Sequence, residues 1–445
     1  MRSKTINMSE GEPIRLLIIF AVPMLIGNIF QQVYNLVDSM IVGRFVGAGA
    51  LAAVGATNSV TFLFFSLCNG IGSGGGIVTS QYFGAGDQEK IRKAIANSAY
   101  IMFSAALVMS IIAYLATVPV LRFMGTPKEI MRDAVVYMHM SCIGVPFIAV
   151  YNYASSMLRA LGDSRTPLYF LIFSCFFNAG LDILCVYTLE MGVFGAALAT
   201  IIAQLTAGLG CLLYAVRFNS YFRLEKGHFR IEKDIIREAV RMGVPLSLQY
   251  SMIAVSCMAL QRVVNSFGTA AIAAFTATSR IEQLLHQPYG SLGMAMSTYS
   301  GQNLGAGRLD RIKLGYRKSL LLMAVFSLLM LPLMQFGGNG IVKMFVDDPE
   351  VIALGAVAVK ITSWFYLFLG MIYVTRGMLN GVGDAMFAFI NGIVEMTGRI
   401  FIPAGLSMIP LFGIWGIWWA AGLTWLISAF FCVLRYFAWK KKKGI

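Results

Sequence analysis

Long apolar stretches separated by short polar loops run along the whole chain of 445 residues. A stretch of about 20 apolar residues is long enough to cross the roughly 30 Å hydrocarbon core of a bilayer as a helix. The pattern therefore predicts an all-α integral membrane protein with twelve transmembrane helices. The predicted spans lie at 14–40, 51–78, 94–118, 131–157, 166–189, 193–217, 237–263, 271–298, 316–337, 351–380, 386–408 and 412–438.

The second half of the chain repeats the first in the same register. The segment 80–86, SQYFGAG, recurs as GQNLGAG at 301–307, and each copy precedes a charged stretch and a new apolar run. A register kept over most of the chain indicates a duplicated unit of six helices. Six spans return the chain to its starting side of the membrane, so the two repeats are predicted to be parallel. The same register relates Met157-Leu158 to Met378-Leu379, Gly162-Asp163 to Gly383-Asp384, and 192–195 to 413–416.

A long polar segment rich in Arg and Lys joins the two repeats and marks the division of the chain. We expect an N-terminal lobe of six helices at 1–217 and a cytoplasmic linker at 218–236. A C-terminal lobe of six helices with a basic tail follows at 237–445.

Composition and charge agree with a membrane location. Hydrophobic residues make up 58% of the chain and charged residues 13%, whereas about a quarter of a soluble protein is charged. Short loops rich in Lys and Arg stay in the cytoplasm, which predicts a multi-pass protein of the cytoplasmic membrane with both termini cytoplasmic. This bias, with attraction to anionic lipid, accounts for most of the net charge of +14 without a nucleic-acid partner. The predicted cytoplasmic groups are Arg2, Lys4 and Arg15, then Lys90, Arg92 and Lys93, the linker, Arg308, Arg311, Lys313, Arg317 and Lys318, and the lysines at 440–443.

The sequence gives no support to catalysis or signalling. The glycine-rich segment 70–76 lies inside an apolar span and lacks the Gly-Lys-Ser/Thr of a phosphate loop, so it indicates close helix packing. The seven cysteines sit singly, without metal or redox spacing, and indicate reduced packing residues. The sequence offers no nucleophile–base set and no large extramembrane domain, so we expect neither an enzyme nor a receptor, and no cofactor.

A polar stripe along the first predicted helix ends in a carboxylate. Gln31, Tyr34, Asn35 and Asp38 are spaced so that they share one helical face. An ionisable group in hydrocarbon is costly, so this face is predicted to point toward the bundle interior or water. In the alternative interpretation, Asp38 lies near the outer end of its helix and is simply solvated.

A second acid lies in the fifth predicted helix. Asp182 follows Asn178 by one turn, and Thr200 comes eighteen residues later in the sixth helix. Together with Asp38 these oxygens suit Na⁺ or a proton. Alternatively, Asn178 and Thr200 only bridge helices by hydrogen bonds. In the second repeat the register replaces Asp182 by Pro403, so the acid pair is confined to the first lobe.

The second half has its own polar residues inside predicted helices. Glu282 and His286 lie one turn apart, and we expect either a titrating cluster or pairing with Arg262 or Arg280. Gln249 is a further polar residue in the seventh helix. Glu395 and Arg399, also one turn apart, are expected to form a self-neutralising ion pair.

At the first-helix face, the repeated Gln-x-x-Gly-Ala-Gly loop and the set Asn178, Asp182 and Thr200, the chain resembles the multidrug and toxic compound extrusion (MATE) family over essentially its whole length. It looks closest to the prokaryotic branch that includes DinF-like transporters. The resemblance implies two six-helix lobes that form a V around a central cavity. It also implies a proton or Na⁺ coupling site at Asp38, Asn178, Asp182 and Thr200, which match the family's site residue by residue. The weaker candidates for the substrate cavity are Gln31, Tyr34, Asn35, Asn152, Gln249, Glu282 and His286.

We therefore expect a monomeric antiporter that couples entry of H⁺ or Na⁺ to export of amphipathic, cationic small molecules. Asp38 is the expected main coupling carboxylate, because burial raises the proton affinity of such a group. The alternative is a lipid-linked-sugar flippase of related two-lobe fold. A flippase would need a strongly basic cavity for pyrophosphate, so the acids Asp38 and Asp182 favour the antiporter.

Overall fold

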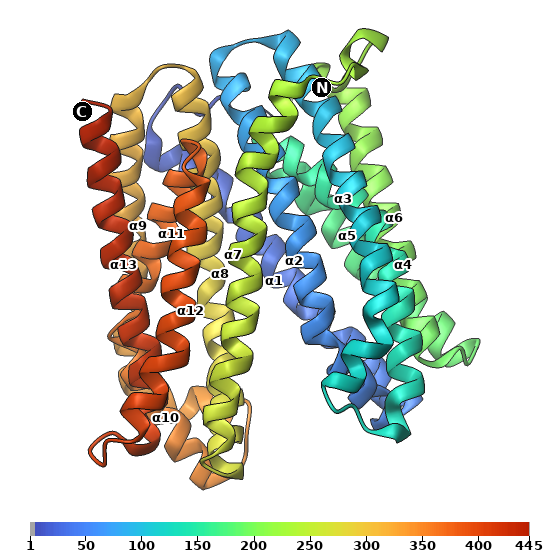
Figure 1. Cartoon of the computed structure of the whole chain (residues 1–445), viewed down its shortest axis with the longest axis vertical. Helices are drawn as coiled ribbons and strands as arrows, with labels where there is room; N and C mark the ends of the chain where they lie inside the picture. The colour runs from blue at the N-terminus through green and yellow to red at the C-terminus, as the bar shows by residue number, and fades with distance from the viewer. Residues whose placement is uncertain (1–4, 445) are drawn as a thin grey trace. The chain divides into compact units, whose positions relative to one another are not determined.

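The chain folds into long helices that coincide with the predicted spans (Figure 1). The structure, a computed structural model, describes residues 5–444, apart from the side chains of residues 58, 59, 63, 254 and 258. The predicted cytoplasmic residues Arg2 and Lys4 lie outside the described residues. The helices of the first repeat are α1 (Pro13–Ile41), α2 (Ala48–Ala85), α3 (Gln88–Phe123), α4 (Lys128–Ala160), α5 (Arg165–Asp182) and α6 (Gly192–Phe218). Those of the second are α7 (Lys233–Asn265), α8 (Thr269–Gly305), α9 (Leu309–Lys343), α10 (Pro349–Ser363), α11 (Tyr366–Gly381), α12 (Ala385–Ser407) and α13 (Gly416–Lys442).

Most helices run several residues past the predicted apolar spans into polar ends. Of the described helices, ten are long and apolar enough to cross a bilayer, and α10 with α11 form an eleventh candidate as one span bent by 53°. The helix α8 is 37 residues long but does not meet the same criterion, and its middle carries Glu282 and His286. The all-helical membrane fold is confirmed. That the predicted span 271–298, which corresponds to α8, also crosses the membrane stays a prediction.

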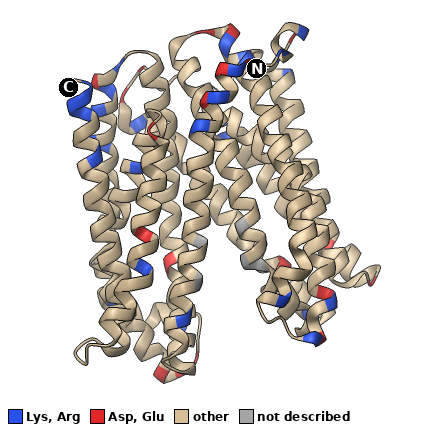
Figure 2. Cartoon of the chain, viewed as in Figure 1, with Lys and Arg blue, Asp and Glu red and all other residues tan. Residues whose placement is uncertain are grey.

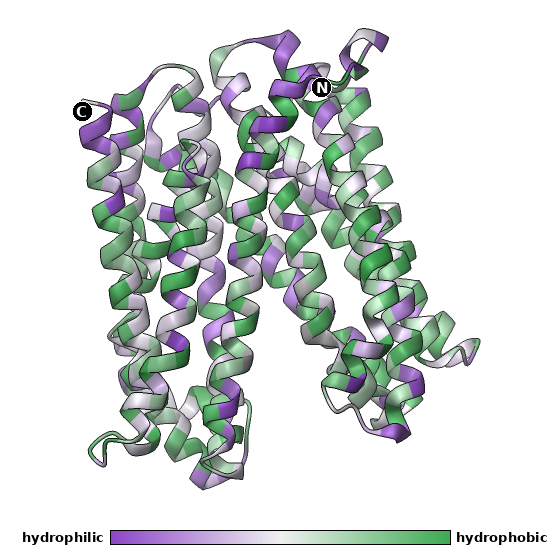
Figure 3. Cartoon of the chain, viewed as in Figure 1, coloured by the Kyte–Doolittle hydropathy of each residue, from purple (hydrophilic) through white to green (hydrophobic). Residues whose placement is uncertain are grey.

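Large apolar side chains remain exposed along the helices. Leu115, Leu213 and Phe336 are exposed over most of their surface, and hydrophobic residues continue along most of the length of the helices (Figure 3). Lipid tails are as apolar as these side chains, so the exposed surface suits a bilayer. Helix association must then depend on close packing rather than on the hydrophobic effect.

The chain divides into two compact units, and two helices are shared between them. Unit 1 comprises Val22–Ser247 with the described residues before Met8, and unit 2 comprises Met8–Ala21 with the chain from Leu248 onward. The first turns of α1 therefore belong to unit 2, and the first half of α7 belongs to unit 1. Each shared helix contains a proline close to the division, at Pro23 and Pro245.

Two repeated sequence motifs have the same backbone conformation in both copies. Gly86 and Gly307, which end the Gly-Ala-Gly loops, have φ of 73° and 70°, and Gly162 and Gly383 have φ of 86° and 87°. These left-handed values disfavour any residue with a Cβ. The repeat of these glycines is thus explained by two kinds of tight turn between helices.

In unit 2, the loop after α8 holds the chain segment that precedes α1. The backbone N–H of Met8 donates to Gln302 Oε1 at 2.8 Å, and Asn303 Nδ2 donates to the Met8 carbonyl at 3.0 Å. Arg308 and Arg311 donate to the carbonyls of Ser9 and Gly11 at 3.0 and 2.8 Å. The second copy of the Gln-x-x-Gly-Ala-Gly loop therefore positions the start of α1.

In unit 1, helix α3 holds the linker segment that precedes α7 in the same manner. Asn97 donates to the Arg230 carbonyl at 3.1 Å and accepts from the Glu232 N–H at 3.0 Å. Lys93 forms an ion pair of 2.9 Å with Glu232. The segments that precede α1 and α7 are thus each tied to residues of the other sequence repeat, within one unit.

Lys and Arg residues gather at the helix ends that carry these docked segments and the C-terminal tail (Figure 2). The lysines at 440–443 close α13, and Arg308 and Arg311 lie at the start of α9. This clustering within each unit is the pattern on which the prediction of cytoplasmic termini rests.

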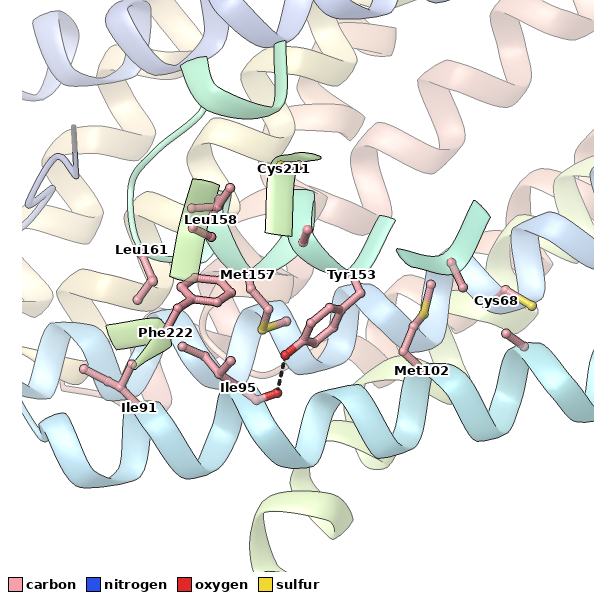
Figure 4. Packing of buried hydrophobic residues seen from close by; sticks show 14 of the residues in the cluster. Cys68, Ile91, Ile95, Met102, Tyr153, Met157, Leu158, Leu161, Cys211 and Phe222 are labelled. Carbon is pink, nitrogen blue, oxygen red and sulfur yellow. Dashed lines mark hydrogen bonds between the residues drawn. The ribbon is translucent and has the colours of Figure 1, made fainter. Parts of the chain in front are cut away.

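Small residues and a compact core hold unit 1 together. Figure 4 shows Cys68, Ile95, Met102, Tyr153 and Met157 packed together, with the Tyr153 hydroxyl donating to the Ile95 carbonyl at 2.7 Å. The segment 70–76 lies against helices rather than around a ligand: a Cβ on Gly70 would lie 2.4 Å from Ser247, and one on Gly74 only 2.3 Å from the Ala239 carbonyl. The packing role predicted for this segment is confirmed.

Replacing Gly74 by alanine is expected to destabilise the protein by about 1–3 kcal/mol, because the backbone of α7 must move away from the added methyl group. The matched control is Gly55→Ala in the same helix, where the new Cβ meets nothing within 4 Å. That control should be neutral or slightly stabilising. Thermal unfolding of both purified variants in detergent measures the difference, and equal melting temperatures would contradict the packing argument.

Candidate functional site

The two acids predicted to form the site meet inside unit 1. The Asp38 side chain of α1 and the Asp182 side chain of α5 are in hydrogen-bonding contact. Asp182 is fully buried. The second oxygen of Asp38, Oδ1, is also buried and has no hydrogen-bond partner among the described residues. The interpretation of Asp38 as a merely solvated group is therefore wrong.

Hydroxyl groups from three helices line the acid pair. The Tyr34 hydroxyl, one turn before Asp38, donates to Thr200 Oγ1 of α6 at 3.2 Å. Tyr137 of α4 lies within electrostatic range of both acids and of Tyr34. Sequence reasoning missed Tyr137, because no polar stripe on α4 distinguishes it from other aromatic residues.

The remaining residues predicted for the first lobe differ in burial. Asn178 is buried in α5, one turn before Asp182. Gln31 is partly exposed and Asn35 is exposed on α1, while Asn152 is partly exposed on α4. Asp38, Asp182, Tyr34 and Thr200 thus form the centre of the candidate site, which we call the acid pair site.

Both acid-bearing helices change to wider π-helical turns beside the acids. The segment η1 (Val42–Val46) follows α1, and η2 (Ile183–Thr188) begins directly after Asp182. The rings of Phe45 and Tyr187 connect the two segments with centroids 5.0 Å apart. Short π-helical turns inside α-helices are often found at functional sites, so these turns are consistent with a functional role for the acid pair.

The electrostatics of the acid pair require a positive partner. Two ionised carboxylates in contact repel each other strongly in a low-dielectric interior. A buried acceptor without a hydrogen-bond partner, such as Asp38 Oδ1, costs about 1–3 kcal/mol. A proton shared by the two groups removes the repulsion, and a small cation coordinated by both, Oδ1 included, removes both penalties. The geometry is therefore suited to binding and releasing one positive charge.

The polar residues predicted for the second lobe lie in unit 2. Gln249 of α7 is buried against Gly392 of α12. Glu282 and His286 of α8 are within electrostatic range of Arg399. Their nearby cation among the described residues is thus Arg399, and not Arg262 or Arg280.

The ion pair predicted between Glu395 and Arg399 is present but is not the closest contact of Glu395. Arg376 of α11 donates to Glu395 Oε1 at 2.8 Å, whereas Arg399 Nη2 lies 3.8 Å from Oε2. Asn391 Nδ2 and Ser428 Oγ complete the surroundings at 3.3 and 3.4 Å. Two arginines therefore share one carboxylate, which the spacing within α12 alone does not indicate.

Comparison with known proteins gives one family over most of the chain. A family model described as MatE matches residues 23–184 and 245–402. The chain is 28% identical over 435 residues to the probable multidrug resistance protein YoeA of Bacillus subtilis (strain 168), covering 96% of this chain and 94% of that protein. It is 23% identical over 423 residues to the multidrug export protein MepA of Staphylococcus haemolyticus (strain JCSC1435), covering 95% and 93%.

The fold also matches solved structures over its full length. A crystal structure of MATE in the bent conformation matches with a TM-score of 0.91 at 22% identity and covers 100% of both chains. An outward-facing conformation of a multidrug resistance MATE family transporter of the MOP superfamily matches with a TM-score of 0.88 at 22% identity, covering 100% of this chain and 98% of that one. At this level of identity the likeness concerns the fold alone.

Proposed function

Because the chain belongs to the MatE family, whose members are transporters rather than enzymes, we propose that it is a secondary active multidrug exporter of the membrane. Entry of a cation at the acid pair site drives the export of amphipathic, cationic compounds. The names of the relatives YoeA and MepA, a probable multidrug resistance protein and a multidrug export protein, support this substrate range.

The observation that carries the proposal is the contact between Asp38 and Asp182 inside a membrane-spanning bundle. A structural ion pair would join opposite charges, whereas this site joins two acids. Such an arrangement has a purpose if it takes up and gives back a positive charge. Direct contact between the two carboxyl groups favours a proton, since Na⁺ would have to separate them to bind both.

The proposed cycle depends on different cation affinities in two conformations. A proton that enters from outside neutralises the acid pair, and its release inside restores the negative charge. This drives transport only if the outward-open and inward-open states bind the proton differently. The π-helical turns beside Asp38 and Asp182 connect the charge of the site to the ends of α1 and α5.

The basic helix ends support the rest of the proposal. We propose that the N-terminus, the linker and the C-terminal lysines face the cytoplasm, and that the protein acts as a monomer. Two features support assignment to the DinF-like branch. The first is the set Asp38, Asn178, Asp182 and Thr200. The second is that the acids of α7, Asp234 and Glu238, lie only at its start.

The test is efflux of a fluorescent organic cation from proteoliposomes under separately imposed proton and sodium gradients. We expect efflux to follow the proton gradient. Efflux that follows only the sodium gradient would overturn the choice of ion and leave the exporter. Absence of any gradient-driven cation movement, together with competition between a lipid-linked sugar and the dye for binding to the purified protein, would replace the exporter by a flippase.

A further inference from the structure

Arg399 is a buried cation in unit 2 with weak contacts. Its side chain is 14% exposed, and the salt bridge to Glu395 is long, at 3.8 Å. Its Nη1 atom donates to Ser256 Oγ at 3.4 Å and to Cys257 Sγ at 3.5 Å. A guanidinium carries five N–H donors in a planar fork, and none of these three contacts is short.

Arg376, and not Arg399, is the main partner that neutralises the charge of Glu395. Arg376 lies 2.8 Å from the carboxylate and also stacks over the Tyr373 ring at 5.5 Å from its centroid. Because Glu395 is occupied by Arg376, Asn391 and Ser428, it neutralises Arg399 only in part. The remaining positive charge of Arg399 faces the side chains of Glu282 and His286.

Two buried polar atoms elsewhere in unit 2 lack partners among the described residues. Trp425 is 2% exposed, and its Nε1–H has no acceptor among the described residues. His286 Nε2 is also buried and also has no hydrogen-bond partner among the described residues. The rings of His286 and Trp425 pack edge to face with centroids 6.0 Å apart. Buried polar atoms in native proteins nearly always have a partner. These atoms therefore indicate a missing polar group beside the aromatic rings of Tyr373 and Trp425.

The internal repeat points to the same position. In the register of the two halves, Arg399 of α12 corresponds to Asn178 of α5, and Asp182 corresponds to Pro403. Unit 1 therefore has an acid, Asp182, where unit 2 has a proline, and unit 2 has a cation, Arg399, where unit 1 has a neutral amide. The two units therefore differ in charge at corresponding positions, which suits ligands of different charge.

We propose that Arg399, with the N–H of Trp425, recognises a carboxylate on a transported organic compound; this rests on the proposed function as an exporter. A carboxylate accepts two parallel hydrogen bonds from a guanidinium and supplies the acceptor that Trp425 lacks. The ring of Tyr373, which is partly exposed, suits the aromatic part of the compound. Glu282, held by a hydrogen bond to Thr362, lies within electrostatic range of Arg399 and competes with the ligand carboxylate for its charge.

The experiment compares two dyes that differ only in this group. Rhodamine B carries a free carboxylate, and its ethyl ester does not. Binding to the purified protein by fluorescence anisotropy gives the ratio of the two dissociation constants. We expect Arg399→Gln to shift this ratio about tenfold or more against the free acid, because a charged hydrogen-bonded pair is lost. Arg399→Lys should give an intermediate shift, since lysine keeps the charge but not the fork.

Two variants make the outcome decisive. Arg262→Gln removes an exposed arginine of α7 and should leave the ratio as in the wild type. Trp425→Phe keeps the ring and removes only the N–H, so a shift in the same direction is expected even if Arg399→Gln does not fold. A folded Arg399→Gln or Trp425→Phe protein with the wild-type ratio would overturn the proposal and leave Arg399 as a bridge between α7 and α12.

Thiol labelling adds a readout that does not depend on transport. Cys257 is exposed and its sulfur lies 3.5 Å from Arg399 Nη1. Free rhodamine B should slow the reaction of Cys257 with a maleimide more than the ester does, with Cys257→Ser identifying the labelled residue. Equal protection by both dyes counts against the proposal. If the wild type moves neither dye under any gradient, the exporter function fails, while the binding ratio still decides the role of Arg399.

Discussion

Proteoliposomes that contain Asp38→Asn are expected to export dye no faster than liposomes without protein, under either gradient. The change removes one of two contacting acids and keeps the size of the side chain. The remaining acid no longer has a like charge beside it, so its affinity for a cation changes little between conformations. A ligand with equal affinity for both states shifts nothing, however tightly it binds.

The loss must come from coupling rather than misfolding. Asparagine removes a repulsion, so the melting temperature of purified Asp38→Asn should not fall below that of the wild type. The matched control is Asp347→Asn, which removes the same charge from an exposed loop and should export normally. Asp182→Asn should behave as Asp38→Asn does, and the double variant should be no worse than either. Wild-type efflux by folded Asp38→Asn would remove the acid pair from the mechanism.

Much of the fold could be predicted because the bilayer imposes simple rules. A helix must be apolar over its crossing length, so apolar stretches located most of the described helices, with α10 and α11 falling within one predicted span. The spacing of Tyr34 and Asp38 followed from helical periodicity. The grouping of Asp38 with Asp182 and Thr200 rested on the chemistry of their oxygens and on the family resemblance, whereas the hydrogen bond from Tyr34 to Thr200 was not predicted.

Contacts between helices distant in sequence could not be predicted in the same way. Periodicity relates Glu395 to Arg399, one turn away, but contains no information about Arg376 on another helix. The proximity of Tyr137 to the acids depends on how α4 packs against α1 and α5. The bend between α10 and α11 also lacks a local signal, since Ser363, Trp364 and Phe365 include neither proline nor glycine.

The repeat shows where the two units have diverged. Both keep the glycine turns at Gly86 and Gly307, because any side chain there would strain the loop. The polar positions inside the helices are not kept, as the pair Asn178 and Arg399 illustrates. Backbone constraints therefore persist in both copies, while charge at the candidate sites differs between them, as expected for positions that set ligand preference.

The second large effect is expected on stability, for Glu395→Gln. This change leaves Arg376 and Arg399 buried in unit 2 without their shared carboxylate, and their side chains are only 10% and 14% exposed. Removing one partner of a buried ion pair costs about 3–5 kcal/mol, because the remaining charge is neither solvated nor compensated. We expect a marked fall in the melting temperature of the purified protein and a lower yield from the membrane.

We expect the loss of stability in Glu395→Gln because the ion pair is buried, not merely because an ion pair is lost. A matched variant at an exposed ion pair distinguishes these two causes. Lys93 and Glu232 form an ion pair of similar length, 2.9 Å, but their side chains are 27% and 39% exposed. Water and salt compensate such charges, so Glu232→Gln should lower the melting temperature far less. Raising the salt concentration should reduce the small effect of Glu232→Gln and leave that of Glu395→Gln nearly unchanged. Equal losses for the two variants would mean that water reaches the Glu395 network, and that Arg399 is solvated rather than held for a ligand.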